Sequence, residues 1–172
     1  MNPLYKQTIH TFLTTNKLNP QERPPQDGAE NWVFDIAENL QSELFCYETQ
    51  PNDISAILMT SVQIKPNDNA TMLAAAICPA LAPAAIVIID NVLSLRLMVR
   101  GDVQSIGALL EESIMITHHI ISSIFPHIVN LADGKTPMQN AMILAMQALQ
   151  GGAQGKQPDQ VDDQVDKPPT DS

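Results

Sequence analysis

Apolar residues of this chain recur at helical spacing in some stretches and alternate with polar residues in others. Near the N-terminus, four of them recur at helix-like intervals ahead of Pro20: Leu4, Ile9, Phe12 and Leu13. This pattern predicts a short amphipathic helix over residues 3–17. Residues 19–30 hold three prolines and a glycine among polar side chains, and we expect them to form a loop.

Three stretches after this loop have the features of β-strands. Trp32, Phe34 and Ile36 alternate with Val33, Asp35 and Ala37, which predicts a strand over 31–37 with one buried face. Residues 44–47 are expected to form a second short strand. Residues 54–64, rich in β-branched and aliphatic side chains, are expected to form a third. With polar turns between them, the three strands predict an antiparallel meander.

A second helix and a hairpin follow the meander. Residues 66–68 offer a cap and an acidic first turn for a helix from Asn69 to about Ala80, whose alanines permit close packing. Two β-prone runs, 85–89 and 92–99, then flank the dipeptide Asp90-Asn91. Both of these residues tolerate positive φ, so the pattern predicts a tight hairpin.

A long third helix is predicted next, capped by either Asp102 or Ser105 and stopped by Pro126 after Ile124. Its apolar residues spread over far more than one narrow stripe, which exceeds the need of a surface helix. We therefore expect one side to pack on the sheet and another to be covered by a second chain or by a short flanking helix. Residues 138–149 are the candidate for that helix.

These elements predict an α+β fold, an antiparallel sheet flanked by helices in the order α-β-β-β-α-β-β-α. Residues 1–126 are interpreted as the main domain and 127–150 as an accessory C-terminal helix. Residues 151–172 carry five aspartates and no large apolar side chain except two valines, which predicts a disordered acidic tail.

The charge of the chain argues against several classes of partner. Its 172 residues carry 9 Lys and Arg against 19 Asp and Glu, a net charge of −10. Such a charge repels phosphate backbones and anionic headgroups, so we expect no nucleic-acid partner and no membrane insertion. The N-terminus lacks the apolar core of a signal peptide, and Cys46 and Cys78 lack metal or redox spacing. We expect a cytoplasmic protein with reduced thiols.

The sequence contains no catalytic signature. His118 and His119 are adjacent, so on a helix they point about 100° apart and do not suit one metal ion. Residues 151–156 resemble a phosphate-binding loop, but no strand precedes them and no helix follows. We expect no enzyme activity, no cofactor and no metal. The alternative from another class is a small hydrolase or metal enzyme that uses His118, His119 and Asp102.

Apolar side chains on the predicted strands exceed what one sheet-on-helix layer uses. The stretches that contain Trp32, Phe34 and Ile36, and Ile57 and Met59, are the clearest examples. Two interpretations stand. Either the first and third helices cover both faces of the sheet, or part of the sheet is kept for a partner chain.

The order of elements resembles that of the class I chaperones of bacterial type III secretion. The resemblance covers about residues 2–126 and is carried by seven stretches: 4–13, 32–37, 44–47, 54–64, 72–77, 86–99 and 106–124. It rests on pattern and acidity and on no invariant motif. It implies a dimeric α/β sandwich that binds the N-terminal region of a secreted effector in extended form, without ATP or catalysis.

The resemblance also implies two sets of contact residues. The dimer interface would be formed by the second helix and the hairpin, through Met72, Leu73, Ala76, Ile77, Val87, Ile89 and Leu95. Effector contacts would fall on the first helix and the sheet, through Phe12, Trp32, Phe34, Ile36 and Met59. The order of elements is similar to that of bacterial YbjN-like proteins as well. A regulatory or binding protein of that kind is therefore the alternative function.

Overall fold

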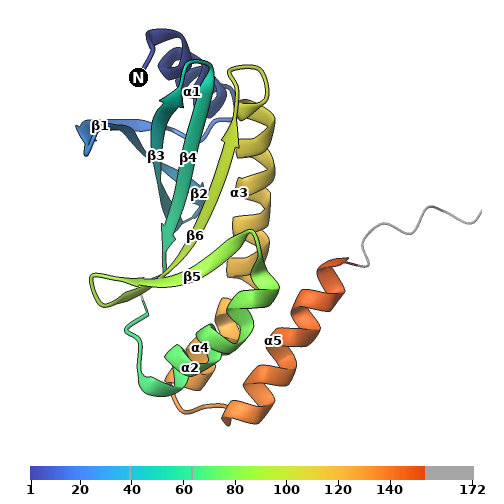
Figure 1. Cartoon of the computed structure of the whole chain (residues 1–172). Helices are drawn as coiled ribbons and strands as arrows, with labels where there is room; N and C mark the ends of the chain where they lie inside the picture. The colour runs from blue at the N-terminus through green and yellow to red at the C-terminus, as the bar shows by residue number, and fades with distance from the viewer. Residues whose placement is uncertain (39, 63, 154–172) are drawn as a thin grey trace, which may run out of the picture.

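The computed structural model describes residues 1–38, 40–62 and 64–153 (Figure 1). In this part of the chain, six strands form one antiparallel sheet with the order β1-β2-β3-β4-β6-β5. The strands are β1 (Gln21–Gln26), β2 (Ala29–Ala37), β3 (Leu40–Gln50), β4 (Asp53–Ser61), β5 (Ala84–Ile89) and β6 (Val92–Gly101). The helices are α1 (Pro3–Thr15), α2 (Asp68–Ile77), the short 3-10 helix η1 (Cys78–Leu81), α3 (Ile106–Ser123), α4 (Phe125–Ala132) and α5 (Met138–Ala153). The predicted α+β class and the meander are confirmed.

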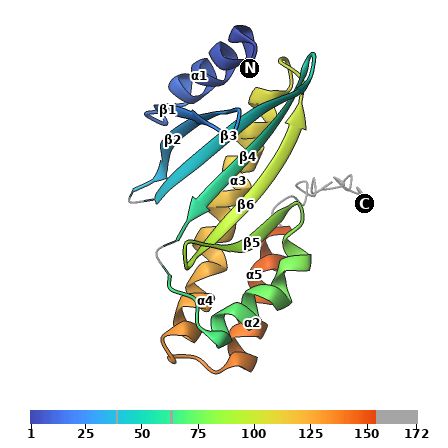
Figure 2. The same cartoon turned by 60° about the vertical axis from the view of Figure 1, so that its left-hand side comes forward.

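Helices α1 and α3 pack on the same face of the sheet (Figure 2). Along β4, Ile54, Ala56 and Leu58 are buried while the residues between them are partly exposed. This alternation follows from the two-residue period of a strand. The buried residues of β2, β3 and β4 meet α1 and the start of α3 in a first core, which includes Tyr5, Ile9, Leu13, Trp32, Phe34, Leu44, Ile106 and Leu110. The opposite face, called the outer face below, lies outside this core.

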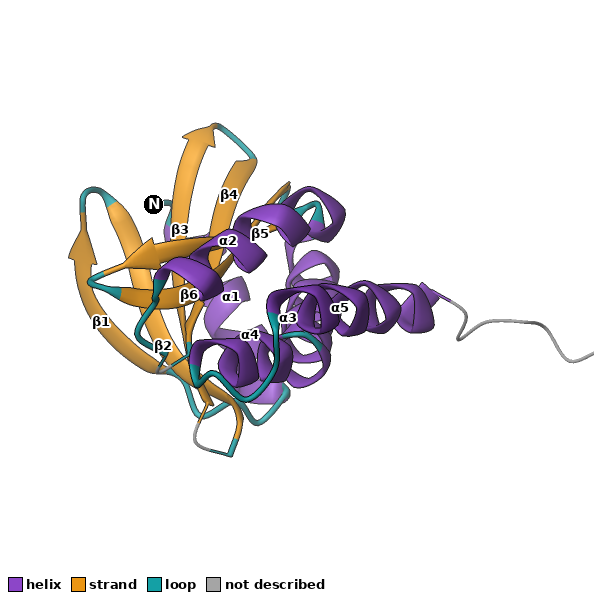
Figure 3. Cartoon of the chain, turned by 90° about the horizontal axis from the view of Figure 1, so that it is seen from below, coloured by secondary structure: helices purple, strands orange, loops and turns teal. Residues whose placement is uncertain are grey.

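A second core lies at the other end of the molecule, where α2, α4 and α5 pack together (Figure 3). It joins these helices to β5, β6 and the end of α3, and its members include Leu73, Ile77, Leu93, Leu95, Ile120, Phe125, Ile128, Leu131, Ala141 and Ala145. Helix α3 runs along the sheet and supplies residues to both cores. Its broad apolar surface is therefore used in part by two separate packing contacts, and α5 docks on its own subunit.

The hairpin predicted at Asp90-Asn91 is confirmed. Both residues have positive φ, 49° and 61°, as a two-residue turn with the twist of the flanking strands requires. Val92 pairs with Ile89 directly across this turn.

The prediction of a loop over 19–30 is wrong, because β1 and the start of β2 occupy most of this stretch. Asp27 and Gly28 form a tight turn with φ of 50° and 81°, and Asp-Gly is a strong hairpin signal. The three prolines obscured this signal. Lys6 of α1 forms ion pairs with Glu22 of β1 and Glu30 of β2, and these ion pairs connect β1 to the helix.

Several element boundaries also differ from the prediction. The strand expected over 44–47 is eleven residues long, and the strand expected to reach Ile64 ends at Ser61. The second helix ends at Ile77 and continues as η1. Pro126 does not end the helical region, because proline fits the first turn of a new helix, α4. Helix α5 extends past residue 150 to Ala153, and the predicted disordered tail otherwise lies outside the described residues.

Asp102 supplies the cap of α3, which the sequence left open between Asp102 and Ser105. Its carboxylate accepts hydrogen bonds from the backbone N–H groups of Gln104 and Ser105 and from the Ser105 hydroxyl, at 2.8–3.0 Å. The hydrogen bonds from Ser105 lower the pKa of Asp102 below its usual value. The charged carboxylate thus stabilises the positive end of the helix dipole.

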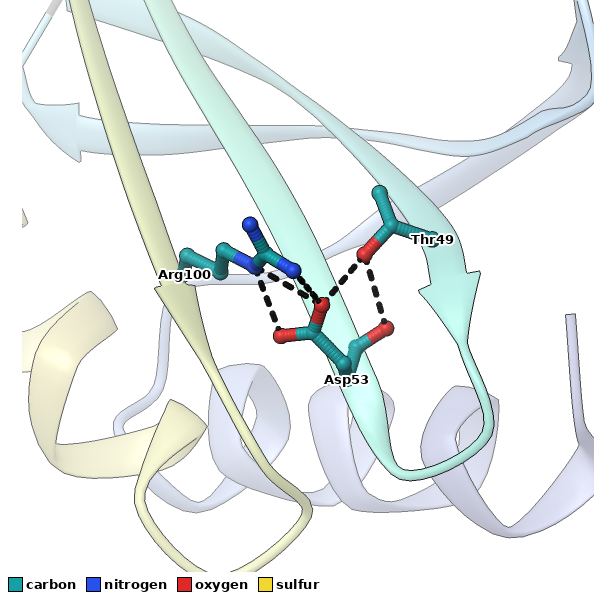
Figure 4. A network of polar contacts seen from close by, with 3 residues as sticks. All are labelled: Thr49, Asp53 and Arg100. Carbon is teal, nitrogen blue, oxygen red and sulfur yellow. Dashed lines mark hydrogen bonds and ion pairs between the residues drawn. The ribbon is translucent and has the colours of Figure 1, made fainter.

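A polar network fixes the end of the β3–β4 hairpin to β6 (Figure 4). The guanidinium of Arg100 donates to both carboxylate oxygens of Asp53, with Nε at 2.7 and 2.9 Å. The hydroxyl of Thr49 donates to the same carboxylate at 2.6 Å. Arg100 foremost, and then Thr49, lower the pKa of Asp53. The network therefore favours the folded chain while Asp53 is ionised.

We expect Asp53→Asn to lower the urea midpoint slightly at pH 7. A depressed folded-state pKa stabilises the protein above the unfolded value, near pH 3.9, and this contribution is lost as pH falls. The difference between variant and wild type should therefore disappear toward pH 2. Asp133→Asn, which removes an exposed ion pair inside one loop, is the control. Equal effects of both substitutions at every pH would contradict this account.

We expect Leu73→Ala in α2 to lower the free energy of unfolding by about 2–5 kcal/mol, because it removes methyl groups from the second core. Ile143→Ala in α5 is the matched control, since Ile143 is 49% exposed. Its effect should stay below about 0.5 kcal/mol. Urea unfolding followed by the fluorescence of the buried Trp32 measures both, and similar losses would show that α2 and α5 do not pack as described.

Candidate functional site

Apolar side chains lie on the outer face of the sheet, along its two central strands. Phe45 of β3 pairs with Ile57 of β4, and Met59 lies two residues further along β4. All three side chains are partly exposed. They remain so because α1 and α3 pack on the other face. The outer face is thus the part of the sheet that the described helices leave accessible.

A hollow of about 360 Å³ lies over these side chains. Val87 and Ile89 of β5 line it on one side, and Gln26 and Asp27 of the β1–β2 turn line it on another. These segments come from opposite edges of the sheet. The sheet is therefore curled strongly enough for both edges to border one mostly apolar hollow.

A second hollow of about 1010 Å³ lies next to the first, and Met59 lines both. It is more polar, because Lys17, Arg23, Asp35 and Glu38 lie on its walls. The two hollows together are called the outer-face groove. It has an apolar half and a charged half, which suits a ligand longer than a single small molecule.

The five residues proposed for effector contacts separate into two groups. Met59 and Ile36 line the groove. Trp32 and Phe34 lie in the first core with exposures of 0% and 2%, and Phe12 packs against that core. Register explains why Met59 lies outside the core, since it alternates with the buried Leu58 along β4. Ile36 shares the face of Trp32 and Phe34 by the same period, and it packs against the first core while it lines the groove. The structure assigns Trp32 and Phe34 to the core and not to a contact surface.

The seven residues proposed for the dimer interface separate as well. Leu73, Ile77 and Leu95 are fully buried in the second core of a single chain. Met72 is 63% exposed on α2, and Ala76 is exposed on the same helix. Val87 and Ile89 line the groove. The intramolecular packing of α2 on α4 and α5 thus occupies the side of α2 that holds Leu73 and Ile77.

Sequence reasoning missed most of the groove. Phe45 and Tyr47 were assigned to a strand but not to a site, and Val87 and Ile89 were assigned to a dimer. Alternation along β3 could have identified Phe45 and Tyr47 as a set facing away from Leu44 and Cys46. No local pattern could show that the β1–β2 turn approaches β5, because that depends on the curl of the sheet.

The residues of the hydrolase alternative are not brought together. Asp102 caps the start of α3, and His118 is exposed sixteen positions later, roughly 24 Å along the helix axis. His119 is exposed beside it. Cys46 is fully buried, and burial raises the pKa of its thiol far above the usual value. Within the described ranges, no group of three or more His, Cys, Asp or Glu residues could hold a metal ion.

The stretch Ile106–Ala132 is long and apolar enough to cross a membrane, with a mean hydropathy of 1.3. This stretch comprises two helices, α3 and α4, and supplies residues to both cores. One third of it is buried in the molecule. A helix packed in a protein core meets the same criteria, so this composition agrees with the packing of α3.

No protein-family model matches this sequence, and no curated protein matches it. A functional conclusion therefore rests on the geometry of the groove and on the chemistry of its walls.

Proposed function

We propose that this protein is a cytoplasmic chaperone of the type III secretion class, which binds the N-terminal region of a secreted effector in extended form. The supporting observation is the outer-face groove, which leaves Phe45, Ile57 and Met59 accessible on a sheet covered on its other face. An unfolded client segment carries apolar side chains that such a groove can shelter. Binding without catalysis keeps the segment soluble and ready for secretion.

The two edges of the sheet differ in a way that suits an extended client. Strand β5 (Ala84–Ile89) contains neither proline nor a charged residue, and its outer edge has no partner strand among the described residues. Strand β1 holds Pro24 and Pro25, which lack backbone N–H donors. An incoming strand can therefore form main-chain hydrogen bonds more readily along β5 than along β1. Val87 and Ile89 connect that edge to the groove.

The acidic charge of the chain supports the same role. A net charge of −10 keeps a protein apart from other copies and from anionic surfaces. An exposed apolar groove would otherwise favour aggregation. A client loaded on this surface would gain the same protection.

We further propose that the chaperone is a homodimer that meets through the exposed side of α2. Met72, Ala75 and Ala76 are exposed there, and residues 69–89 contain no charged side chain. An uncharged contact area lets two chains of equal net charge meet without local repulsion between like charges. The small side chains allow the helices to pack at short range.

We expect Ile57→Asp to abolish capture of the client, because a carboxylate placed in the apolar half of the groove opposes burial of apolar side chains. Tagged protein expressed in its native cells is isolated, and bound proteins and their protected segments are identified by mass spectrometry. The wild type should retain the N-terminal segment of a secreted protein. The variant should retain at least about tenfold less.

Ile143→Asp is the matched control, since Ile143 is exposed on α5 and does not line the groove. It should capture the client as the wild type does. Capture of partners through folded domains, or equal capture by both variants, would contradict the chaperone proposal. A YbjN-like regulator would capture no secreted client at all.

We expect Met72→Asp to convert a dimer into a monomer in light scattering at micromolar concentration. A carboxylate at this exposed site would be buried without a partner on association. Met115→Asp on α3 is the control, since Met115 is 61% exposed away from α2. A wild-type monomer, or a dimer that survives Met72→Asp, would exclude this interface.

A further inference from the structure

The Lys and Arg side chains of the described residues divide into those that form an ion pair with a carboxylate and those that do not. Lys6, Arg100 and Lys135 form ion pairs with carboxylates. Within the described ranges, the cations outside any ion pair are Lys17, Arg23, Lys65 and Arg96. Three of them line the groove, and Arg96 alone lines its apolar half. On a protein of net charge −10, these free cations make the groove a place where a negatively charged group could bind.

The strand register places uncharged residues next to Arg96 on β4, β5 and β6, and Glu43 of β3 lies one strand further, beyond Met59. Directly across from Arg96 lie Met59 on β4 and Ala85 on β5. Its diagonal neighbours across the strands, and its same-face neighbours along β6, are all uncharged: Ile57, Ser61, Pro83, Val87, Ser94 and Met98. Asp27 is the one carboxylate that lines the same hollow, and it lies beyond ion-pair distance. Arg100, four residues further along β6, differs from Arg96 because it forms an ion pair with Asp53.

We propose that Arg96 selects the client by receiving one Asp or Glu side chain, flanked at the second residue on each side by apolar side chains. This inference rests on the proposed function and specifies its client. In an extended strand, residues i and i±2 point to one face about 6.6 Å apart. A client segment that crosses the sheet from Ile57 to Val87 would thus place a carboxylate at Arg96 and apolar neighbours over those two residues, and beyond Val87 it would reach the open edge of β5. Guanidinium and carboxylate groups form paired hydrogen bonds, which fix both position and orientation.

The occupant is a peptide with an isolated acidic residue and not an acidic run. The charged half of the groove holds Asp35 and Glu38, and the chain as a whole is strongly negative. Several client carboxylates in a row would be repelled by these charges. One carboxylate among apolar residues satisfies both the free guanidinium and the apolar walls.

A phage-displayed library of random peptides, about twelve residues long to match an extended strand, tests the inference. It is selected against full-length wild type, Arg96→Glu, Ile57→Asp and the control Lys65→Glu, which changes a free cation outside the groove. Wild type and Lys65→Glu should enrich Asp or Glu between apolar residues at i±2. Arg96→Glu should enrich Lys or Arg at that position. Replacing the acidic residue of a selected peptide by its amide should weaken wild-type binding about tenfold and leave Arg96→Glu binding nearly unchanged.

The possible failures are distinguishable. If Arg96→Glu selects the same peptides as wild type, and Ile57→Asp selects none of them, the groove binds peptides but Arg96 does not read them, so only this inference is overturned. If wild type selects nothing beyond what Ile57→Asp selects, the proposed function fails as well. If Ile57→Asp turns a dimer into a monomer in light scattering, a second copy occupies the groove, and both proposals are overturned.

Discussion

Helices cover one face of the sheet and leave the other face open, and the groove exists because of this asymmetry. Because α1 and α3 pack on the same face, alternate side chains in the middle of β2, β3 and β4 enter the first core. The intervening side chains are left on the outer face. Because Phe45, Ile57 and Met59 are among these, the chain presents an apolar sheet surface where a two-layer fold would present a polar one. The groove follows from this choice of faces and from the curl of the sheet.

The net negative charge of the protein counteracts a disadvantage of its exposed apolar groove. Acidic residues outnumber basic ones about two to one over the chain. In the part of the chain that the structure describes, Asp27 is the one carboxylate that lines the apolar half of the groove. Repulsion between copies offsets the tendency of exposed apolar surface to aggregate. Among the described residues Arg96 has no ion-pair partner, and the selection that we propose for it would be favoured by its positive charge.

Helices α4 and α5 cover the side of α2 that was expected to form a dimer contact. In the resemblance with secretion chaperones, this helix is the expected contact between two copies, and Leu73 and Ile77 would belong to that contact. Here these side chains pack against α4 and α5 of the same chain. What remains outside is a surface of small uncharged residues around Met72, which offers contact area with little specific shape. A dimer formed through α2 would therefore have a smaller contact surface than the sequence predicted.

Most helices and strands and the Asp90-Asn91 turn could be predicted from the residues alone, because these depend on local periodicity and on φ preference. The alternation around Trp32, the hairpin at Asp90-Asn91 and the apolar breadth of α3 were all readable from neighbouring residues. Strand β1 was not predicted because it contains two prolines, although the Asp27-Gly28 turn that follows it is typical of a hairpin. Which face of each strand the helices cover depends on packing between distant segments, and that packing places Trp32 in the core and Ile57 in the groove. Period-two alternation separates two sets of side chains but carries no information on which set a distant helix will cover.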